Sequence, residues 1–274
     1  MINSPDQNKD SSKPKKHLGQ NFLSDKKILE KIVNAGDIKG DETVVEIGPG
    51  RGSLTRTLLS TGVKVIAVEK DEGLVSFLKE TFAEEIESKQ LTIIEGDVLE
   101  ERDALEKKLK DKEYKVIANI PYYITGKILR FIFSLDNLPS SVVLLIQDEV
   151  AKRIVSDTES ILSLSIKAFG TPVYRGKVKA GSFFPAPKVD SAILAIENIS
   201  RDFFTTINEA DFFKTIRRAF SQKRKTLLNT LFAQDKERGK NILNQVGLEE
   251  TTRPQEVPLE TWQKLLHLLY EKNA

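Results

Sequence analysis

Cysteine is absent from this chain of 274 residues, and histidine occurs only twice. Without cysteine there is no disulfide bond, no thiolate metal site and no cysteine nucleophile. The two histidines, His17 and His267, lie at opposite ends of the sequence, which argues against a zinc site or a histidine-dependent catalytic triad. We therefore expect a protein that holds no metal.

Long apolar runs are also missing from the sequence. No stretch of about 18 apolar residues occurs, so we expect no transmembrane helix, and the first residues lack the apolar core of a secretory signal. Apolar residues make up 39% and charged residues 30% of the chain, which is typical of globular proteins in water. These features predict a cytoplasmic protein, and a monomer is the default because no element for association is apparent.

A large excess of charge is absent too, since the net charge is only +2, but the basic residues are unevenly distributed. One group lies between residues 212 and 234, where no acid occurs, and another lies in the N-terminal stretch. A single short run would be an ordinary solvated surface, but two runs on either side of a central region favour a polyanionic partner. We assign RNA binding to Lys15, Lys16, Arg217, Arg218, Lys223, Arg224 and Lys225.

Strand-like and helix-like segments alternate through the centre of the chain. The continuous apolar runs at 43–47, 64–68, 91–94, 115–118 and 142–146 predict buried strands of a parallel sheet with helices on both faces. Runs at 173–179 and 192–197 have no long helix between them and predict an antiparallel pair at the edge of the sheet. We expect an α-helix to begin near Ser24 or Asp25 and to end at Gly36.

The pattern predicts three parts along the chain. Residues 1–16 are polar and basic and predict a disordered arm. Residues 17–200 carry the alternating strands and helices of an α/β domain. Residues 201–274 contain only amphipathic helical patterns, which predict a small all-helical C-terminal domain.

The end of the first predicted strand carries a glycine-rich turn. Its spacing, Gly-x-Gly-x-Gly from Gly48 to Gly52, differs from the Gly-x-Gly-x-x-Gly of dinucleotide sites, because Ser53 takes the last position. Such a turn lets a ligand approach the backbone closely, although alone it is a weak signal. It marks a candidate cofactor site.

Acidic residues end the next two predicted strands and strengthen this interpretation. Glu69 follows Gly48 by 21 residues, where a carboxylate can accept hydrogen bonds from both hydroxyls of a ribose. Asp97 can accept a hydrogen bond from an adenine amino group, with Val98 against the ring. Together with the turn, these acids fit S-adenosylmethionine better than NAD.

The fourth predicted strand ends in the most specific motif of the chain, Asn119-Ile120-Pro121-Tyr122. An adenine N6 amine is a poor nucleophile, because its lone pair is delocalised into the ring. The side-chain carbonyl of Asn119 and the backbone carbonyl of Ile120 can hold its two hydrogens and direct the lone pair towards a methyl donor. Pro121 stiffens the turn, and Tyr122 offers an aromatic face to the base. Catalysis would come mainly from positioning and electrostatics.

The motifs, in their order, resemble those of the ribosomal RNA adenine dimethyltransferases. The resemblance covers nearly the whole chain after the first 16 residues, and the joint occurrence of its motifs is highly specific. It rests on KHLGQNFL (16–23), the glycine turn, Gly96-Asp97, NIPY (119–122), FFPAPKVDS (183–191) and FSQKRKTL (220–227).

This resemblance implies a fold and a role for each matched residue. It implies a Rossmann-like S-adenosylmethionine methyltransferase sheet, mostly parallel with an antiparallel edge, and a helical C-terminal domain. Asn21 and Leu23 would contact the methionine end of the cofactor, with Gly48 beneath it, while Glu69 would hold the ribose and Asp97 the adenine.

For the target base, the resemblance implies that Asn119 orients the amine beside the cofactor. Tyr122 and Phe183 would enclose the base after it has left its stack. The expected reaction places two methyl groups on each of two adjacent adenosines in the hairpin loop near the 3′ end of small-subunit rRNA. The expected substrate is an immature small ribosomal subunit, and S-adenosyl-L-homocysteine is the second product.

The sequence departs from the family pattern at two places, and it leaves other interpretations open. Ile120 replaces the commoner leucine, and Gly126-Lys127 stands where the family usually has a small polar residue and proline, which affects local loop geometry. The alternatives are the resistance branch of the family, which modifies large-subunit rRNA, an NAD-dependent dehydrogenase, and a ribosome-assembly factor that acts by binding alone.

Overall fold

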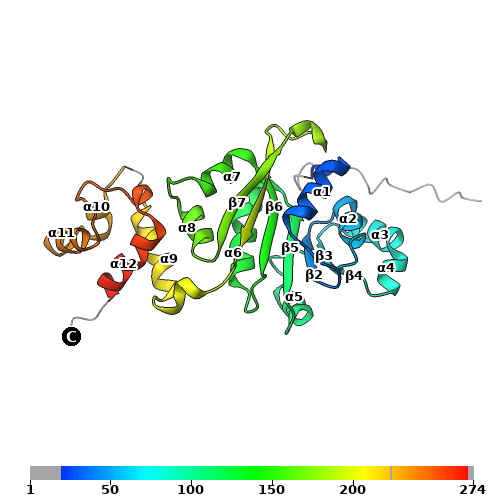
Figure 1. Ribbon diagram of the computed structural model, residues 1–274, viewed down its shortest axis with the longest axis horizontal. Coiled ribbons are helices and arrows are strands. Elements are labelled where there is room, and N and C mark those ends of the chain that lie inside the picture. Colours follow the sequence, from blue (N-terminus) through cyan, green and yellow to red (C-terminus); the bar gives the residue numbers. More distant parts are fainter. Residues whose placement is uncertain (1–19, 223, 271–274) are drawn as a thin grey trace, which may run out of the picture. The chain divides into compact units, whose positions relative to one another are not determined.

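The computed structural model describes residues 20–222 and 224–270 (Figure 1). The predicted strands are confirmed, with ends that differ by one or two residues. The strands are β1 (Phe22–Leu23), β2 (Thr43–Ile47), β3 (Lys64–Glu69), β4 (Leu91–Glu95), β5 (Tyr114–Asn119), β6 (Ser141–Gln147), β7 (Thr171–Val178), β8 (Phe183–Phe184) and β9 (Ser191–Glu197).

Helices connect most of these strands. The α-helices are α1 (Lys26–Ala35), α2 (Ser53–Leu59), α3 (Glu72–Thr81), α4 (Ala83–Glu87), α5 (Arg102–Leu109), α6 (Thr125–Ser134), α7 (Asp148–Val155), α8 (Ile161–Lys167), α9 (Glu209–Ala219), α10 (Leu227–Leu231), α11 (Lys236–Gln245) and α12 (Leu259–Tyr270). Short 3-10 helices cover Tyr122–Ile124, Ala180–Ser182, Asp202–Thr205 and Pro254–Glu256. As predicted, α1 begins after Asp25, whose carboxylate accepts the backbone N–H groups of Lys27 and Ile28.

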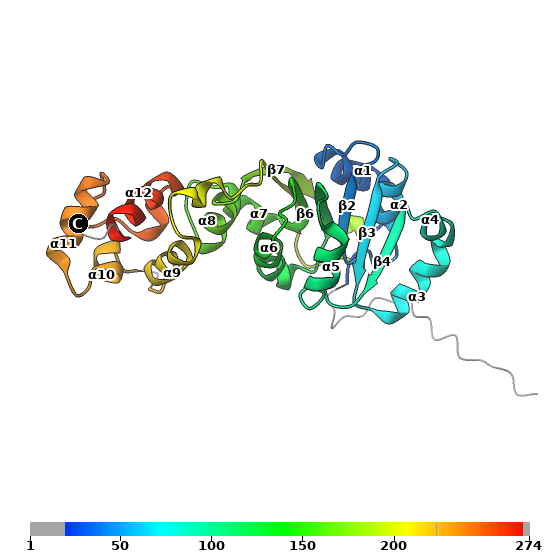
Figure 2. The ribbon, with the colours of Figure 1, turned by 90° about the horizontal axis from the view of Figure 1, so that it is seen from below.

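Seven strands form one sheet in the order β4-β3-β2-β5-β6-β9-β7. The pairs β2–β3, β2–β5, β3–β4 and β5–β6 are parallel, and β9 and β7 form the edge, which confirms the mostly parallel sheet with an antiparallel edge. Every residue of β2 is buried, as expected for an apolar strand covered on both faces. Figure 2 shows β2, β3 and β4 side by side, with α3 and α4 next to β4.

The order of the sheet changes direction at β2, which explains the position of the site. The chain runs outward through β2, β3 and β4, and then returns to place β5 on the other side of β2. Ligands of open α/β sheets bind outside the carboxyl ends of the strands at such a reversal. The turns after β2, β3, β4 and β5 therefore meet in one place.

The contacts divide the chain into two compact units. We call residues 20–148 with Arg175–Ala195 the sheet unit, and Glu149–Tyr174 with residues 196–270 the helical unit. Residues 149–174 join the C-terminal helices because Leu164 and Ala168, at α8, share a buried core with Phe212 and Ile216 of α9. The boundary predicted at residue 200 places α8 in the α/β domain instead of with the C-terminal helices. That boundary stays a prediction.

The core of the helical unit is rich in aromatic rings. Phe212 is fully buried, and its ring centroid lies 5.2 Å from those of Phe203 and Phe213 and 5.7 Å from that of Phe204. Trp262 of α12 is fully buried as well. Large rings that meet at tilted angles bury much apolar area, and they account for the stability of these short helices.

Candidate functional site

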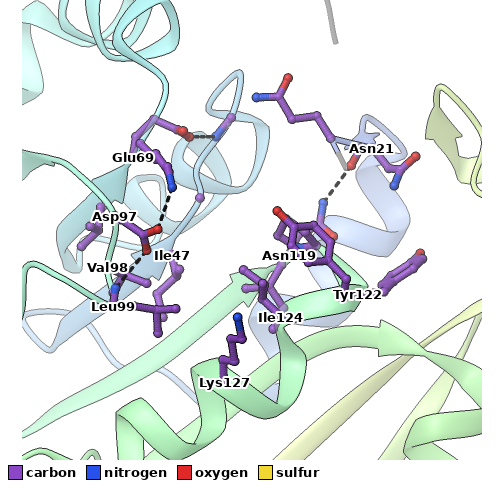
Figure 3. Close-up of a pocket in the computed structure, with 18 of the residues that line it drawn as sticks. Asn21, Ile47, Glu69, Asp97, Val98, Leu99, Asn119, Tyr122, Ile124 and Lys127 are labelled. Carbon is purple, nitrogen blue, oxygen red and sulfur yellow. Dashed lines mark hydrogen bonds and ion pairs between the residues drawn. The ribbon is translucent and has the colours of Figure 1, made fainter. Parts of the chain in front are cut away.

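A cavity of about 320 Å³ opens at the carboxyl ends of β2, β3, β4 and β5 in the sheet unit (Figure 3). Its size is within the range of small-molecule sites. Turns and strand ends from five parts of the sequence contribute to its wall. The lining residues are Gln20, Asn21, Phe22, Ile47, Gly48, Gly50, Val68, Glu69, Lys70, Gly96, Asp97, Val98, Leu99, Asn119, Ile120, Pro121, Tyr122, Tyr123, Ile124 and Lys127.

The glycine turn after β2 requires glycine for two reasons. Gly50 and Gly52 have φ angles of 58° and 76°, in the left-handed region that other residues rarely adopt. A Cβ atom at Gly52 would lie 2.4 Å from the ring of Phe82, and one at Gly50 would lie 2.9 Å from the ring of Phe22. The turn can thus pack against both rings while its backbone remains open to the cavity.

Glu69, at the end of β3, connects the turn to the neighbouring strand. Its Oε2 accepts the backbone N–H of Gly50 at 3.0 Å, and its Oε1 accepts the N–H of Asp71 at 2.9 Å. Its side chain is almost completely buried, and burial raises the pKa of its carboxyl while the hydrogen bonds from Asp71 and Gly50 oppose the rise. The carboxylate is held rigidly and keeps lone pairs for a ligand hydroxyl.

Asp97, after β4, lies at the same end of the cavity (Figure 3). Its Oδ1 accepts the N–H of Leu99 at 3.0 Å, and its Oδ2 accepts Lys70 Nζ at 2.8 Å. Partial burial alone would raise the pKa of Asp97, but the hydrogen bonds from Lys70 and Leu99 outweigh it and hold the pKa below the ordinary value. The group is therefore an ionised acceptor at neutral pH.

Asn119, the last residue of β5, faces this cavity from the other side (Figure 3). Its Nδ2 donates to the backbone carbonyl of Asn21 at 3.2 Å. This bond fixes the orientation of the amide, so that Oδ1 is the side-chain atom left to accept a hydrogen bond from a ligand. Ile120 is buried and Pro121 is half-buried, and both line the cavity.

Tyr122 follows in the short 3-10 helix before α6. Its hydroxyl shares a hydrogen bond of 2.5 Å with Ser191 Oγ, and its carbonyl accepts the Thr125 hydroxyl. Burial raises the pKa of Tyr122, so the phenol stays neutral, and the hydrogen bond with Ser191 fixes its ring in the wall of the cavity. A fixed, neutral aromatic side chain is suited to stack on a base.

Comparison with known proteins places this chain in a family. The family model of the ribosomal RNA adenine dimethylases matches residues 11–270. The chain belongs to this family. It is 39% identical over 264 residues to ribosomal RNA small subunit methyltransferase A of Dehalococcoides mccartyi, covering 94% of this chain and 89% of that one. It is 35% identical over 276 residues to the protein of the same name from Lactobacillus johnsonii, covering 95% and 92%.

Solved structures share the fold of this chain. A dimethyladenosine transferase from Plasmodium falciparum has a TM-score of 0.74 and 29% identity, covering 89% of this chain and 96% of that chain. The 23S rRNA methyltransferase ErmE has a TM-score of 0.72 and 23% identity, covering 91% and 99%, which shows a shared fold. The predicted Rossmann-like methyltransferase fold and the predicted enzyme class, an adenine dimethyltransferase, are confirmed.

Most of the family residues predicted from the motifs line the one cavity, but two do not. Leu23 and Phe183 are 4% and 5% exposed, and they are register partners in the two-stranded sheet β1–β8. They act as packing beneath the cavity wall in this structure. Their contacts with cofactor and base stay a prediction, as do the roles of the lining residues.

The structure adds residues to the site for which the sequence predicted no role. Gln20, Phe22, Leu99, Lys70 and Lys127 line the cavity. Lys127 belongs to the departure from the family pattern, yet α6 begins normally at Thr125 and directs Lys127 to the cavity. The sequence shows a lysine at position 127, but only the start of α6 shows that it lies at the cavity.

Four of the seven predicted RNA-binding residues lie in the described part of the chain. Lys15, Lys16 and Lys223 lie outside the described residues. Arg217, Arg224 and Lys225 are exposed on the helical unit. Arg218 is exposed too, but its Nε donates to the carbonyl of Thr230 at 3.1 Å, so it also joins α9 to α10.

The described residues hold neither a cluster of metal ligands nor a helix that could span a membrane. Over residues 20–222 and 224–270, no group of three or more His, Asp or Glu side chains is arranged to hold a metal ion. In the same residues, no helix is both long and apolar enough to span a membrane.

Proposed function

We propose that this chain uses S-adenosylmethionine to dimethylate the N6 amines of two adjacent adenosines in the 3′-terminal hairpin loop of small-subunit rRNA, within an immature small ribosomal subunit. The observation that supports this most is the position of Asn119, whose amide is oriented by Asn21 and whose Oδ1 is left as an acceptor beside a nucleoside-sized cavity. The named relatives are small-subunit enzymes, which favours that substrate.

The residues present fit an adenosyl cofactor. Glu69 is a buried acceptor for ribose hydroxyls, and Asp97 is an ionised acceptor for an adenine amino group, with Val98 and Leu99 as apolar neighbours. The open backbone of the glycine turn at Gly48 allows close approach of the amino-acid end. When bound, this cofactor supplies a methyl group on a positively charged sulfur, and no metal is required.

The chain's own groups prepare the target amine for transfer. The Oδ1 of Asn119 and the carbonyl of Ile120 would accept the two N6 hydrogens, which turns the nitrogen lone pair towards the methyl carbon. The amine nitrogen would bond to the methyl carbon in place of the cofactor sulfur, which would keep the electrons of the broken C–S bond. One amine proton leaves to water, and the amine is neutral again for the second transfer. Tyr122 would hold the base by stacking.

The proposed reaction is tested with tritiated S-adenosylmethionine and undermethylated small ribosomal subunits, followed by digestion of the RNA and identification of the labelled nucleoside. We expect dimethyladenosine at two adjacent positions near the 3′ end. Asn119→Ala should lower kcat on the order of a hundredfold or more, while Asn34→Ala, an exposed asparagine of α1, should leave it unchanged.

Other outcomes would favour the alternative functions. Label on large-subunit RNA would place the chain in the resistance branch. Cofactor binding without label on either RNA would favour an assembly factor that acts by binding. Calorimetry with S-adenosylmethionine and NAD tests the dehydrogenase alternative, because a dehydrogenase should bind NAD more tightly than S-adenosylmethionine. An Asn119→Ala protein that still binds immature subunits would show that binding and catalysis coexist.

A further inference from the structure

The small sheet β1–β8 has one buried face and one open face. Residues that are directly opposite in an antiparallel pair point to the same side of the sheet. Leu23 and Phe183 are opposite each other, and both are buried. Phe22 and Phe184 are the other pair; Phe22 lines the cavity, and the side chain of Phe184 is 66% exposed. Phe184 therefore lies on the cavity side of this sheet.

A second exposed aromatic side chain lies in the wall of the cavity itself. Tyr123 follows directly after the motif residue Tyr122, lines the cavity and is 68% exposed. Among the described residues, Tyr123 and Phe184 are the most exposed of the large apolar side chains, followed by Tyr270 of the helical unit at 45%. We call Tyr123 and Phe184 the rim aromatics. Single exposed rings are common, but two beside one functional cavity indicate a partner that covers them.

Cationic side chains line the cavity or follow the rim aromatics in the sequence. Lys127 lines the cavity and is exposed, and Lys188 is exposed four residues after Phe184, whereas Lys70 of the cavity wall is paired with Asp97 at 2.8 Å. The guanidinium of Arg51 lies 4.9 Å from the ring centre of Phe22. Open aromatic faces among cations are typical of sites for single-stranded nucleic acid, where rings stack on bases and cations contact phosphates.

We propose that Tyr123 and Phe184 stack on the bases of the nucleotides that flank the target adenosine. This inference rests on the proposed function and adds residues that hold the substrate outside the cavity. An adenosine that enters the cavity leaves the stack, so its neighbours lose a stacking partner. The rim aromatics replace that partner and lower the cost of extruding the target.

The first test compares alanine variants of the full chain with its wild type. Phe184→Ala and Tyr123→Ala should each raise the KM for RNA by about five- to a hundredfold, the effect of losing one base-stacking contact. Phe184→Ala should leave the Kd for S-adenosylmethionine unchanged, because Phe184 is not among the lining residues. Val189→Ala, which alters a side chain 44% exposed in the same segment, is the matched control and should leave the KM for RNA unchanged.

A second set of variants separates stacking from a general apolar contact. Phe184→Tyr and Tyr123→Phe keep the ring and should retain the wild-type KM, whereas Phe184→Leu keeps apolar bulk without a π face and should behave as alanine. Wild-type KM in Phe184→Ala and Tyr123→Ala, or equal rescue by leucine and tyrosine, would overturn the inference.

A binding measurement keeps this test independent of catalysis. A single-stranded RNA with 2-aminopurine next to the target adenosine should lose fluorescence on binding the wild type, since stacking quenches this base, and should lose less with Phe184→Ala. If the wild type transfers no methyl group, the proposed function fails, but quenching that depends on the rim aromatics would still support the stacking sites. Binding without such quenching would overturn them.

Discussion

The sheet unit and the helical unit differ in how many acidic residues they bury. In the sheet unit, Glu46, Glu69 and Asp71 are at most 6% exposed, and Glu69 lines the cavity. Among the described residues of the helical unit, Glu159 is the one buried acid, paired with Lys167 at 2.6 Å, and the largest buried side chains are Trp262 and Phe212. Burying charged groups costs stability unless they are hydrogen-bonded, while burying rings supplies it. One unit thus sustains a binding site, and the other consists mainly of apolar packing.

The largest effect should come from the helical unit. Phe212→Ala removes a fully buried ring that contacts three others, and should lower the free energy of unfolding by about 3–5 kcal/mol. The chain has a single tryptophan, Trp262, which is buried in the same core, so tryptophan fluorescence during urea unfolding reports on this unit. Cofactor affinity, measured on the folded protein, should not change.

A matched control for this variant is Lys214→Ala, on the exposed side of the same helix. Its fluorescence midpoint in urea should stay within a few tenths of a molar of wild type. A Phe212→Ala protein with wild-type stability, or one with weakened cofactor binding, would contradict the separation between the two units.

The next effect should appear in the sheet unit as a change of binding. Glu69→Gln replaces an acceptor of two backbone N–H groups with an amide that can accept only through its oxygen. We expect S-adenosylmethionine to bind about ten- to a hundredfold more weakly by calorimetry, since charge-assisted hydrogen bonds contribute about 1.5–3 kcal/mol. Glu95→Gln is the control, because Glu95 is the exposed register partner of Glu69 on β4. Equal affinities for both variants would remove Glu69 from the cofactor site.

In the sheet unit, we also expect a smaller effect on the pH dependence of stability. Burial raises the pKa of Glu46 from 4.5 to about 8, although the Thr55 hydroxyl donates to its Oε2 at 2.6 Å. Between pH 4.5 and about 8, Glu46 keeps its proton in the folded protein but has released it in the unfolded chain. The contribution of Glu46 to stability is complete below pH 4.5 and is lost as the pH rises through about 8, at up to about 1.4 kcal/mol per pH unit.

Urea unfolding at several pH values between 5 and 8, followed by circular dichroism, measures this slope. Glu46→Gln cannot titrate and keeps an acceptor for Thr55, so its stability should decline less than that of wild type over this range. Glu84→Gln, on the exposed side of α4, should keep the wild-type slope. An unchanged slope in Glu46→Gln would show that Glu46 is already ionised in the folded protein.

The smallest expected effect is a change in stability, and it is seen by comparing substitutions at two glycines of the sheet unit. A Cβ at Gly126, in the first turn of α6, would meet nothing within 4 Å, so Gly126→Ala should raise the free energy of unfolding by about 0.5–1 kcal/mol. Gly52→Ala should destabilise the protein, because its Cβ would overlap the ring of Phe82. Thermal unfolding of both variants measures the contrast, and a loss of stability in Gly126→Ala would reveal strain at the start of α6.

Much of the sheet unit could be predicted from local sequence. The apolar runs that became β2 to β6 are continuous, so their burial and their parallel pairing follow from composition and spacing. Glu69, Asp97 and Asn119 share one cavity because each ends a parallel strand and the carboxyl ends of such strands meet. The grouping of α8 with the C-terminal helices was not predicted, because its apolar residues do not show which surface they cover.

The sequence by itself determined the family, the order of strands along the chain and the residue types at the strand ends, since these depend on local pattern. Only the tertiary structure decided which of two adjacent phenylalanines is open to a partner. The pairing of β1 with β8 buries Phe183, exposes Phe184 and brings the carbonyl of Asn21 to Asn119, 98 residues away. Two strands of two residues carry too little local signal to predict that pairing, because its energy comes from contacts between distant segments.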